Sequence, residues 1–210
     1  MSLTAGVIAV QGDATEHAAA IERAARAHGE RAEGVEIRRA GRVPDCDVLL
    51  LPGGESTAIT RHLHREGIAD EIEAHVARGK PVLATCAGLI VASRDAGDAR
   101  VETLGLLDVT VERNAFGRQR DSFEARLNVD GLDEPFPAVF IRAPRISAVG
   151  DDGTVEVLAE HGGSPVAVRD GPVVGTAFHP ELTGDPRVHG LAFFESMPAR
   201  DATRRSNRPN

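Results

Sequence analysis

The sequence predicts an α/β fold, a three-layer sandwich with a mostly parallel central sheet and an added antiparallel section in the second half. Two observations support this prediction. In the first half, short apolar runs alternate with helical segments of about 10–15 residues, the spacing of parallel strands joined by crossover helices. From about residue 105, short strands follow one another across turn signals such as DDG and HGG instead.

The first half contains four predicted strands and the helices between them. The strands are GVIAV at 6–10, VEIRRA at 35–40, DVLLL at 47–51 and PVLAT at 81–85. Continuous apolar runs such as DVLLL are typical of strands buried on both faces of a parallel sheet. An Ala-rich helix ends at Gly29, a second helix capped by Ser56 or Thr57 continues to Gly79, and GLIVASRDA forms the third.

The second half contains six short predicted strands and one amphipathic helix. The strands are at 106–113, 122–129, 137–144, 155–161, 164–170 and 172–180. The helix is RVHGLAFFESM at 187–197, and a polar tail at 198–210 is expected to be disordered. We therefore expect a single domain over residues 1–197.

Composition excludes several classes of function. The formal net charge is −8, whereas a nucleic-acid-binding surface needs a basic footprint. No apolar run approaches the ~20 residues that span a bilayer, and the first residues lack signal-peptide features, so we expect a cytoplasmic protein. Basic residues are almost all Arg, with Lys80 the single lysine. Such a surface suits a high-salt cytosol, but coding bias towards Arg explains it equally well.

Cys86, in the stretch LATCAGLI, has the layout of a nucleophile elbow. A strand, a candidate reactive residue, the small residues Ala87 and Gly88, and a helix follow in that order. A thiol at a helix N-terminus is favoured as thiolate. A packed core thiol fits the stretch equally well. Cys46 has no such turn and is expected in the core, and the two cysteines form neither a disulfide framework nor a metal signature.

His179 and Glu181 follow another predicted strand, and residues two apart in an extended chain point to the same side. A carboxylate beside an imidazole orients the ring and stabilises its cation. Gly53 and Gly54 follow a third strand and, with Ala87, offer backbone N–H groups for an oxyanion. Ligands bind at the carboxyl ends of strands in open α/β sheets, so we expect these groups in one crevice.

The other histidines give weaker signals. His62, His64 and His75 lie on predicted helices without a shared face, and a solvated position is the better interpretation. His17 and His28 lie on the first helix and offer no metal spacing. We expect neither a metal site nor a cofactor.

The motifs together resemble those of class I glutamine amidotransferases, which have a flavodoxin-like fold. The chain is similar to those that serve as glutaminase subunits of pyridoxal 5′-phosphate synthases, in the vitamin B6 pathway. The matching stretches are GVIAVQGDATEH, LLLPGGESTAI, TCAGLI, RNAFGRQRDSFEA, FIRAPRI and TAFHPELTGD. Ala84 stands where family members often have glycine. Because it should lie in the strand two residues before the thiol, we expect this difference to have little effect.

The resemblance implies a Cys-His-Glu triad that hydrolyses L-glutamine through a glutamyl thioester. Cys86 is then the nucleophile, His179 the acid and base, and Glu181 its orienting partner. The implied glutamine-binding residues are Gly53, Gly54, Glu55, Arg113, Ile141 and Arg142, and the implied oxyanion-hole groups are Gly54 and Ala87. The implied partner is a synthase subunit that receives the ammonia and whose docking completes the oxyanion hole.

Three alternatives remain. The first is a glutaminase that serves another synthase, such as the imidazole glycerol phosphate type. The RNAFGRQ motif argues against it. An inactive partner-binding relative has no need of the intact Cys86, His179 and Glu181. A peptidase- or chaperone-like relative does not explain the glycine pair together with FIR.

Overall fold

The computed structural model describes residues 2–10, 14–113 and 122–194, and its main sheet has seven strands within this part. The strands are β1 (Ser2–Ile8), β2 (Arg31–Ile37), β3 (Val48–Leu51), β4 (Val82–Thr85), β10 (Val155–His161), β11 (Ser164–Asp170) and β12 (Val173–Thr176). Their order is β10-β11-β12-β4-β3-β1-β2. The pairs from β12 to β2 are parallel, and β10 and β11 continue the sheet as antiparallel strands.

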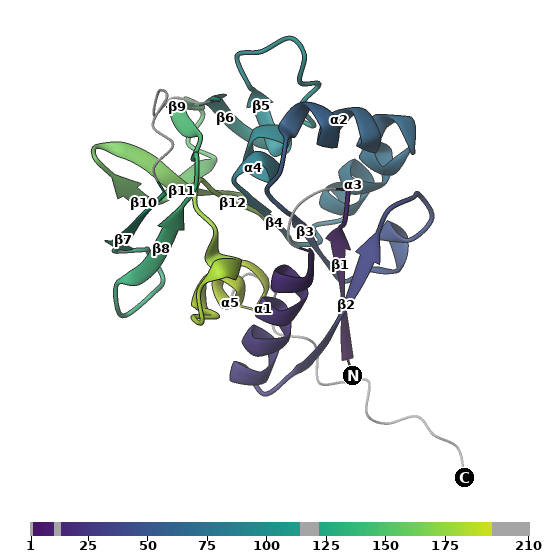
Figure 1. Ribbon diagram of the computed structural model, residues 1–210, viewed down its shortest axis with the longest axis horizontal. Helices are drawn as coiled ribbons and strands as arrows, with labels where there is room; N and C mark the ends of the chain where they lie inside the picture. Colours follow the sequence, from purple (N-terminus) through teal and green to yellow (C-terminus); the bar gives the residue numbers. More distant parts are fainter. Residues whose placement is uncertain (1, 11–13, 114–121, 195–210) are drawn as a thin grey trace.

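Helices cover both faces of this sheet (Figure 1). They are α1 (Ala14–Ala27), α2 (Ser56–Arg65), α3 (Ile68–Ala77), α4 (Ala87–Ala92) and α5 (Arg187–Phe193). Helices α1 and α5 lie on one face, and α2, α3 and α4 lie on the other. The predicted three-layer α/β fold with an antiparallel section is confirmed.

The three strands at the centre of the sheet are buried along their whole length. Every residue of β3, β4 and β12 is buried, as their apolar sequences predict. Because these strands are parallel, their carboxyl ends meet at one edge of the sheet. That edge carries Pro52, Cys86 and the segment leading to His179.

Two smaller sheets complete the described part of the chain. One contains β5 (Ser93–Asp95), β6 (Leu107–Glu112) and β9 (Arg145–Val149), and the other contains β7 (Phe123–Leu127) and β8 (Phe136–Phe140). Strand β9 was not predicted from the sequence. Its residues RISAV are mostly exposed or half-buried. Buried and exposed residues do not alternate regularly along it, as they do in a half-buried strand of the kind that sequence patterns predict. Two short 3₁₀ helices, η1 (Val43–Asp45) and η2 (Pro180–Leu182), lie between larger elements.

Several predicted boundaries are wrong. The helix expected up to Gly79 is divided at Gly67, whose φ of 70° ends α2 and starts α3. The cap of α2 is Glu55, not Ser56 or Thr57, because its carboxylate accepts from two backbone N–H groups. The strand expected from Val35 already begins at Arg31. The third helix ends at Ala92, because the next three residues pair with β6.

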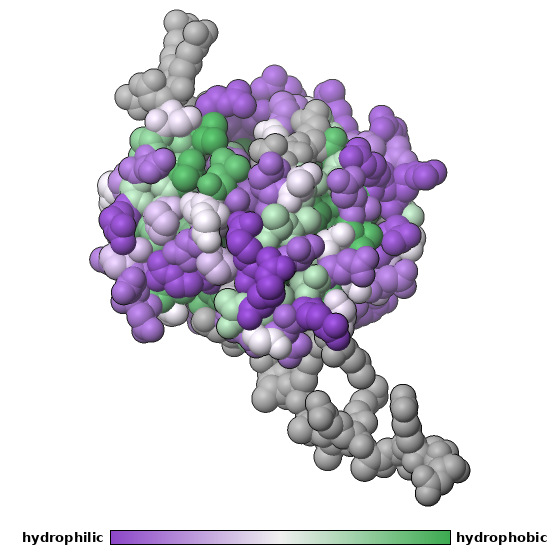
Figure 2. All heavy atoms as spheres, turned by 60° about the horizontal axis from the view of Figure 1, so that its bottom comes forward, coloured by the Kyte–Doolittle hydropathy of each residue, from purple (hydrophilic) through white to green (hydrophobic). Residues whose placement is uncertain are grey.

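Surface exposure also corrects one prediction. His75 is 1% exposed and its Nε2 lies 3.3 Å from the carbonyl oxygen of Pro81, so it is not on a solvated face. Burial lowers the pKa of His75 to about 4, which keeps the ring neutral. Figure 2 shows a face dominated by hydrophilic side chains, with hydrophobic ones in small groups between them.

Some predictions fall outside the described residues. They are the polar tail 198–210, the last three residues of the predicted helix 187–197, and residues 114–119 of the RNAFGRQ motif. The extent of the predicted single domain, 1–197, stays a prediction.

Candidate active site

A cavity of about 430 Å³ lies at the carboxyl edge of the central strands. The sequence-predicted site residues all line it: Gly53, Gly54, Glu55, Cys86, Ala87, Arg113, Ile141, Arg142, His179 and Glu181. They come from the ends of β3, β4, β6 and β8 and from the segment after β12. Segments far apart in the sequence therefore meet in one place, as the strand-end rule predicts.

Cys86 lies at a sharp turn between β4 and α4. Its φ of 52° and ψ of −108° are rare for a residue with a side chain, and such strain of about 1–3 kcal/mol is typical of functional sites. Its backbone N–H donates to the carbonyl of Thr176 at 2.8 Å, which fixes the turn to β12. Gly88 allows α4 to pack closely, because a Cβ there would lie 2.0 Å from the carbonyl oxygen of Leu51.

His179 and Glu181 form a short, buried contact. The His179 Nδ1 lies 2.7 Å from the Glu181 Oε1, and the two side chains are 12% and 1% exposed. The sequence predicted the pairing from an extended chain. The structure instead forms it across the start of η2, where His179 is the N-terminal cap and Glu181 lies in the turn.

Electrostatic interactions couple the thiol, the imidazole and the carboxylate. Burial disfavours the imidazolium, but hydrogen bonds with Cys86 and Glu181 outweigh burial and raise the pKa of His179 to about 10. Burial also disfavours the Glu181 carboxylate, but the hydrogen bond from His179 and the charge of His17 lower its pKa overall. The arrangement therefore favours an imidazolium between two acidic groups.

Gly53 and Gly54 leave the space that this contact needs. A Cβ at Gly53 would lie 2.8 Å from the His179 Cε1 and 3.5 Å from the Cys86 Cβ. Gly54 has a φ of 140°, a conformation that residues with a Cβ rarely adopt. Ala87 is the first residue of α4, so its N–H lies outside the hydrogen bonds of that helix.

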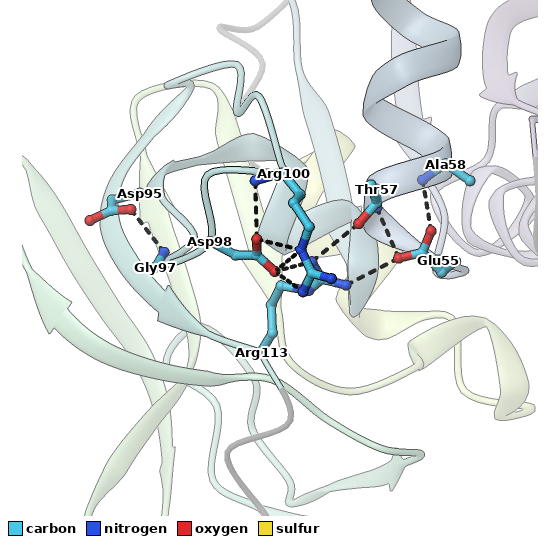
Figure 3. A network of polar contacts seen from close by, with 8 residues as sticks. All are labelled: Glu55, Thr57, Ala58, Asp95, Gly97, Asp98, Arg100 and Arg113. Carbon is cyan, nitrogen blue, oxygen red and sulfur yellow. Dashed lines mark hydrogen bonds and ion pairs between the residues drawn. The ribbon is translucent and has the colours of Figure 1, made fainter.

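Arg113 belongs to a network of polar contacts with Glu55, Asp98 and Arg100 (Figure 3), and Arg113 and Glu55 line the cavity. Its Nη2 donates to the Glu55 Oε1 at 3.0 Å, and its Nη1 donates to the Asp98 Oδ2 at 2.8 Å. Hydrogen bonds from Arg100, with the charge of Arg113, lower the pKa of Asp98. Both terminal nitrogens of Arg113 therefore face carboxylates.

Arg142 is arranged differently. Among the described residues no carboxylate forms an ion pair with it, and its φ of 45° is left-handed. Cys86 and Arg142 are the two non-glycine residues with positive φ in the described part of the chain. The carbonyl oxygen of the preceding Ile141 lies 3.8 Å from the Cys86 Sγ.

Sequence reasoning missed several residues of this region. Ser56, Ile90, Pro144 and Leu182 also line the cavity, and Leu182 is the one large hydrophobic residue described as exposed, at 39%. Asp98 holds Arg113, and the buried His17 lies 3.5 Å from Glu181. No spacing links these residues to the motifs, although His17 stands in the matched stretch GVIAVQGDATEH.

Comparison with known sequences places the chain in a family. Residues 7–197 match the SNO glutamine amidotransferase family. The chain belongs to this family. The class inferred from the motifs is thus confirmed, and the cavity lies at the edge where the motifs of this glutamine amidotransferase meet.

The curated relatives extend over almost the whole chain. A protein of Haloarcula marismortui named "Pyridoxal 5'-phosphate synthase subunit PdxT" is 73% identical over 197 residues, 94% of this chain and 99% of its own. Proteins of the same name from Halobacterium salinarum and Methanothrix thermoacetophila are 71% and 56% identical. They cover 96% and 89% of this chain, and 98% and 96% of their own.

Solved structures agree on the fold. A structure described as "Crystal structure of glutamine amidotransferase" has a TM-score of 0.79 and 43% identity, over 90% of this chain and 96% of that one. The Thermotoga maritima PurLQS structure, at 19% identity, covers 91% of this chain and 94% of that one and shares the fold, with a TM-score of 0.63. No helix in the described ranges is both long and apolar enough for a membrane span.

Proposed function

We propose that this protein is the glutaminase subunit of a pyridoxal 5′-phosphate synthase, which hydrolyses L-glutamine and passes the ammonia to the synthase subunit. The observation that carries the proposal is that Cys86, His179 and Glu181 line one cavity, with the His179 Nδ1 2.7 Å from the Glu181 Oε1. The relatives at 71–73% identity support the choice of synthase, because they are named as subunits of it.

Cys86 is the proposed nucleophile. Its thiolate attacks the side-chain amide carbon of glutamine and forms a tetrahedral oxyanion. The N–H groups of Gly54 and Ala87 are the proposed donors to that oxygen, and docking of the synthase completes their alignment. When the C–N bond breaks, the imidazolium of His179 gives its proton to the nitrogen, which leaves as ammonia.

The second half of the reaction returns the enzyme to its first state. His179, now neutral, takes a proton from water, and the resulting hydroxide attacks the γ-glutamyl thioester. The C–S bond breaks, glutamate leaves, and the Cys86 thiolate pairs again with the imidazolium. Glu181 keeps the proton on the His179 Nδ1, so that Nε2 performs both transfers.

The charged groups at the mouth of the cavity are the proposed binding site for the glutamine head group. Arg142 has no carboxylate partner among the described residues, so it is the better partner for the substrate carboxylate. Arg113 holds Glu55, which lines the cavity and whose carboxylate suits the substrate ammonium. Arg113 therefore contributes to binding through Glu55.

Two further expectations stay predictions. The net charge of −8 argues against a nucleic-acid partner. A cytoplasmic location suits a subunit whose two cysteines are free.

Release of ammonia from glutamine tests the proposal directly. The full-length chain is assayed with and without the synthase subunit, and we expect activity that the synthase increases. Cys86→Ala should reduce it to background. Cys46→Ala is the matched control, because Cys46 is a buried thiol outside the cavity and should retain the activity.

Two results would overturn the assignment. Undiminished activity in Cys86→Ala would exclude the thiol mechanism. Stimulation by an imidazole glycerol phosphate-type synthase, but not by the pyridoxal 5′-phosphate synthase subunit, would reassign the partner.

A further inference from the structure

His17 is a buried histidine that the proposed mechanism does not use. It lies on α1 and is completely buried. Its Nε2 lies 3.5 Å from the Glu181 Oε1 and 3.3 Å from the Thr85 Oγ1. Helix α1 thus reaches the carboxylate behind His179 and the residue immediately before Cys86.

His17 places a second polar group against the Glu181 Oε1, beside His179. A buried carboxylate is unfavourable unless charge or hydrogen bonds compensate for lost water. The Oε1 that accepts from His179 also faces the Nε2 of His17, and a carboxylate cannot donate in return. A proton on the His17 Nε2 suits this contact. Burial disfavours the Glu181 carboxylate, and the charge of His17 acts with the hydrogen bond from His179 to lower its pKa.

The other groups around this pair do not replace His17. His189 on α5 has its ring centre 5.9 Å from that of His17, but burial, with the charge of His17, lowers its pKa to about 3. Arg23 on α1 donates to the carbonyl of Thr183. His17 and His179 are the two side chains that form ion pairs with this carboxylate in the described part of the chain.

We propose that His17 is a positioning residue of this site, which donates from Nε2 towards Glu181 and Thr85 and holds the carboxylate turned towards His179. The Glu181 carboxylate then stays ionised beside the His179 imidazolium to lower pH than it would without His17. The proposal deepens the proposed glutaminase function and rests on it for its kinetic consequence. That consequence is a lower kcat with an unchanged KM, because His17 does not line the cavity.

Alkylation of Cys86 by iodoacetamide as a function of pH tests this proposal without a substrate. The full-length chain is used, and peptide masses separate Cys86 from the buried Cys46. In His17→Leu we expect the acid limb of the Cys86 reactivity profile to move up by about one pH unit. That corresponds to about tenfold slower alkylation on this limb. The reason is that Glu181 takes up a proton more readily and stabilises the imidazolium less.

Matched variants separate positioning from general damage. His75→Leu removes another buried histidine, outside the cavity, and should leave the profile unchanged. His17→Gln places an amide N–H near the former Nε2 and should restore most of the profile, whereas the shorter His17→Asn should not. The Gln and Asn variants also decide the question if His17→Leu does not fold.

Each outcome counts for or against one proposal. Coincident profiles for wild type, His17→Asn and His17→Leu would overturn the role of His17, as would an equal shift in His75→Leu. Glutamine hydrolysis with the synthase subunit is measured on the same samples. If wild type shows the alkylation profile but no hydrolysis, the glutaminase assignment fails and the positioning role stands.

Discussion

The cavity has two sides that are built in different ways. The thiol wall consists of Cys86, His179 and Glu181, and the charged rim consists of Glu55, Asp98, Arg113 and Arg142. On the thiol wall Glu181 is 1% exposed and is held by histidines. On the rim the Glu55 side chain is 55% exposed and is held by an arginine.

This difference indicates a division of labour. Buried contacts in a low dielectric are strong and costly to lose, whereas exposed ion pairs are weak and screened by salt. Changes on the thiol wall should therefore act mainly on kcat, by large factors. Changes on the charged rim should act mainly on KM, by small factors that depend on salt.

The largest expected effect is on the thiol wall, in Glu181→Gln. The amide cannot fix the same tautomer of His179 or stabilise its cation, so we expect kcat to fall roughly 10³–10⁴-fold with little change in KM. Steady-state hydrolysis of glutamine with the synthase subunit measures both constants. Glu55→Gln is the matched change on the rim and should alter KM instead. A loss in kcat of the same size in both variants would contradict the assignment of kcat to the thiol wall and of KM to the charged rim.

The next largest effect is expected for Gly53→Ala. The new Cβ would lie 2.8 Å from the His179 Cε1, so the ring must leave its present position beside Glu181. A displacement of this kind costs about 10²-fold in kcat. The control is Gly184→Ala, because a Cβ at Gly184 meets no atom within 4 Å. Equal activity of the two variants in the hydrolysis assay would show that the reaction tolerates a shift of the His179 ring.

A stability change is expected for His189→Leu, behind the thiol wall. Neither ring nitrogen of His189 has a hydrogen-bond partner among the described residues, so an apolar side chain of similar size should cost less than about 1.5 kcal/mol at neutral pH. The folded-state pKa of His189 is lowered to about 3. As pH falls below about 6.5, the unfolded wild-type chain therefore binds a proton that the folded chain does not, and stability is lost.

The His189→Leu variant does not lose stability in this way as the pH falls, because it has no imidazole at this position. Relative to wild type it should gain roughly 2 kcal/mol between pH 7 and pH 5, measured by urea unfolding at both values. A difference that is constant with pH would contradict a neutral, buried His189.

The smallest effect is expected on the charged rim, for Asp98→Asn. The change weakens the ion pair that holds Arg113 beside Glu55, so KM for glutamine should rise about threefold to tenfold while kcat stays the same. The effect should shrink in high salt. Asp95→Asn is the control from the same loop, since Asp95 contacts only the N–H of Gly97 in Figure 3. A fall in kcat for Asp98→Asn would place Asp98 with the thiol wall.

Sequence reasoning reached the motif-bearing residues on both sides of the cavity. Cys86, His179 and the glycine pair each follow an apolar strand, and the carboxyl ends of parallel strands meet at one edge. Ten predicted residues line the cavity for that reason, together with the family resemblance, which supplied Glu55, Arg113, Ile141 and Arg142.

The residues that support them could not be predicted in this way. His17 contacts Glu181, and Asp98 contacts Arg113, between segments with no fixed spacing. The Glu55 side chain caps α2 by accepting from the N–H groups of Thr57 and Ala58. Sequence reasoning looked for Ser or Thr instead, because these are among the residues preferred at helix N-caps. The buried position of His75 was within reach, since it continues the apolar face of Ile68 and Ile72.

The most direct test is to identify the residue that carries the acyl group during turnover. The full-length chain, mixed with the synthase subunit and glutamine, is quenched in acid, and its peptides are analysed by mass spectrometry. The expected result is a γ-glutamyl group on the peptide containing Cys86, removed by hydroxylamine and missing from Cys86→Ala. A chain that releases ammonia with no acyl group at Cys86, or with the group on the Cys46 peptide, would contradict a thiol mechanism at this cavity.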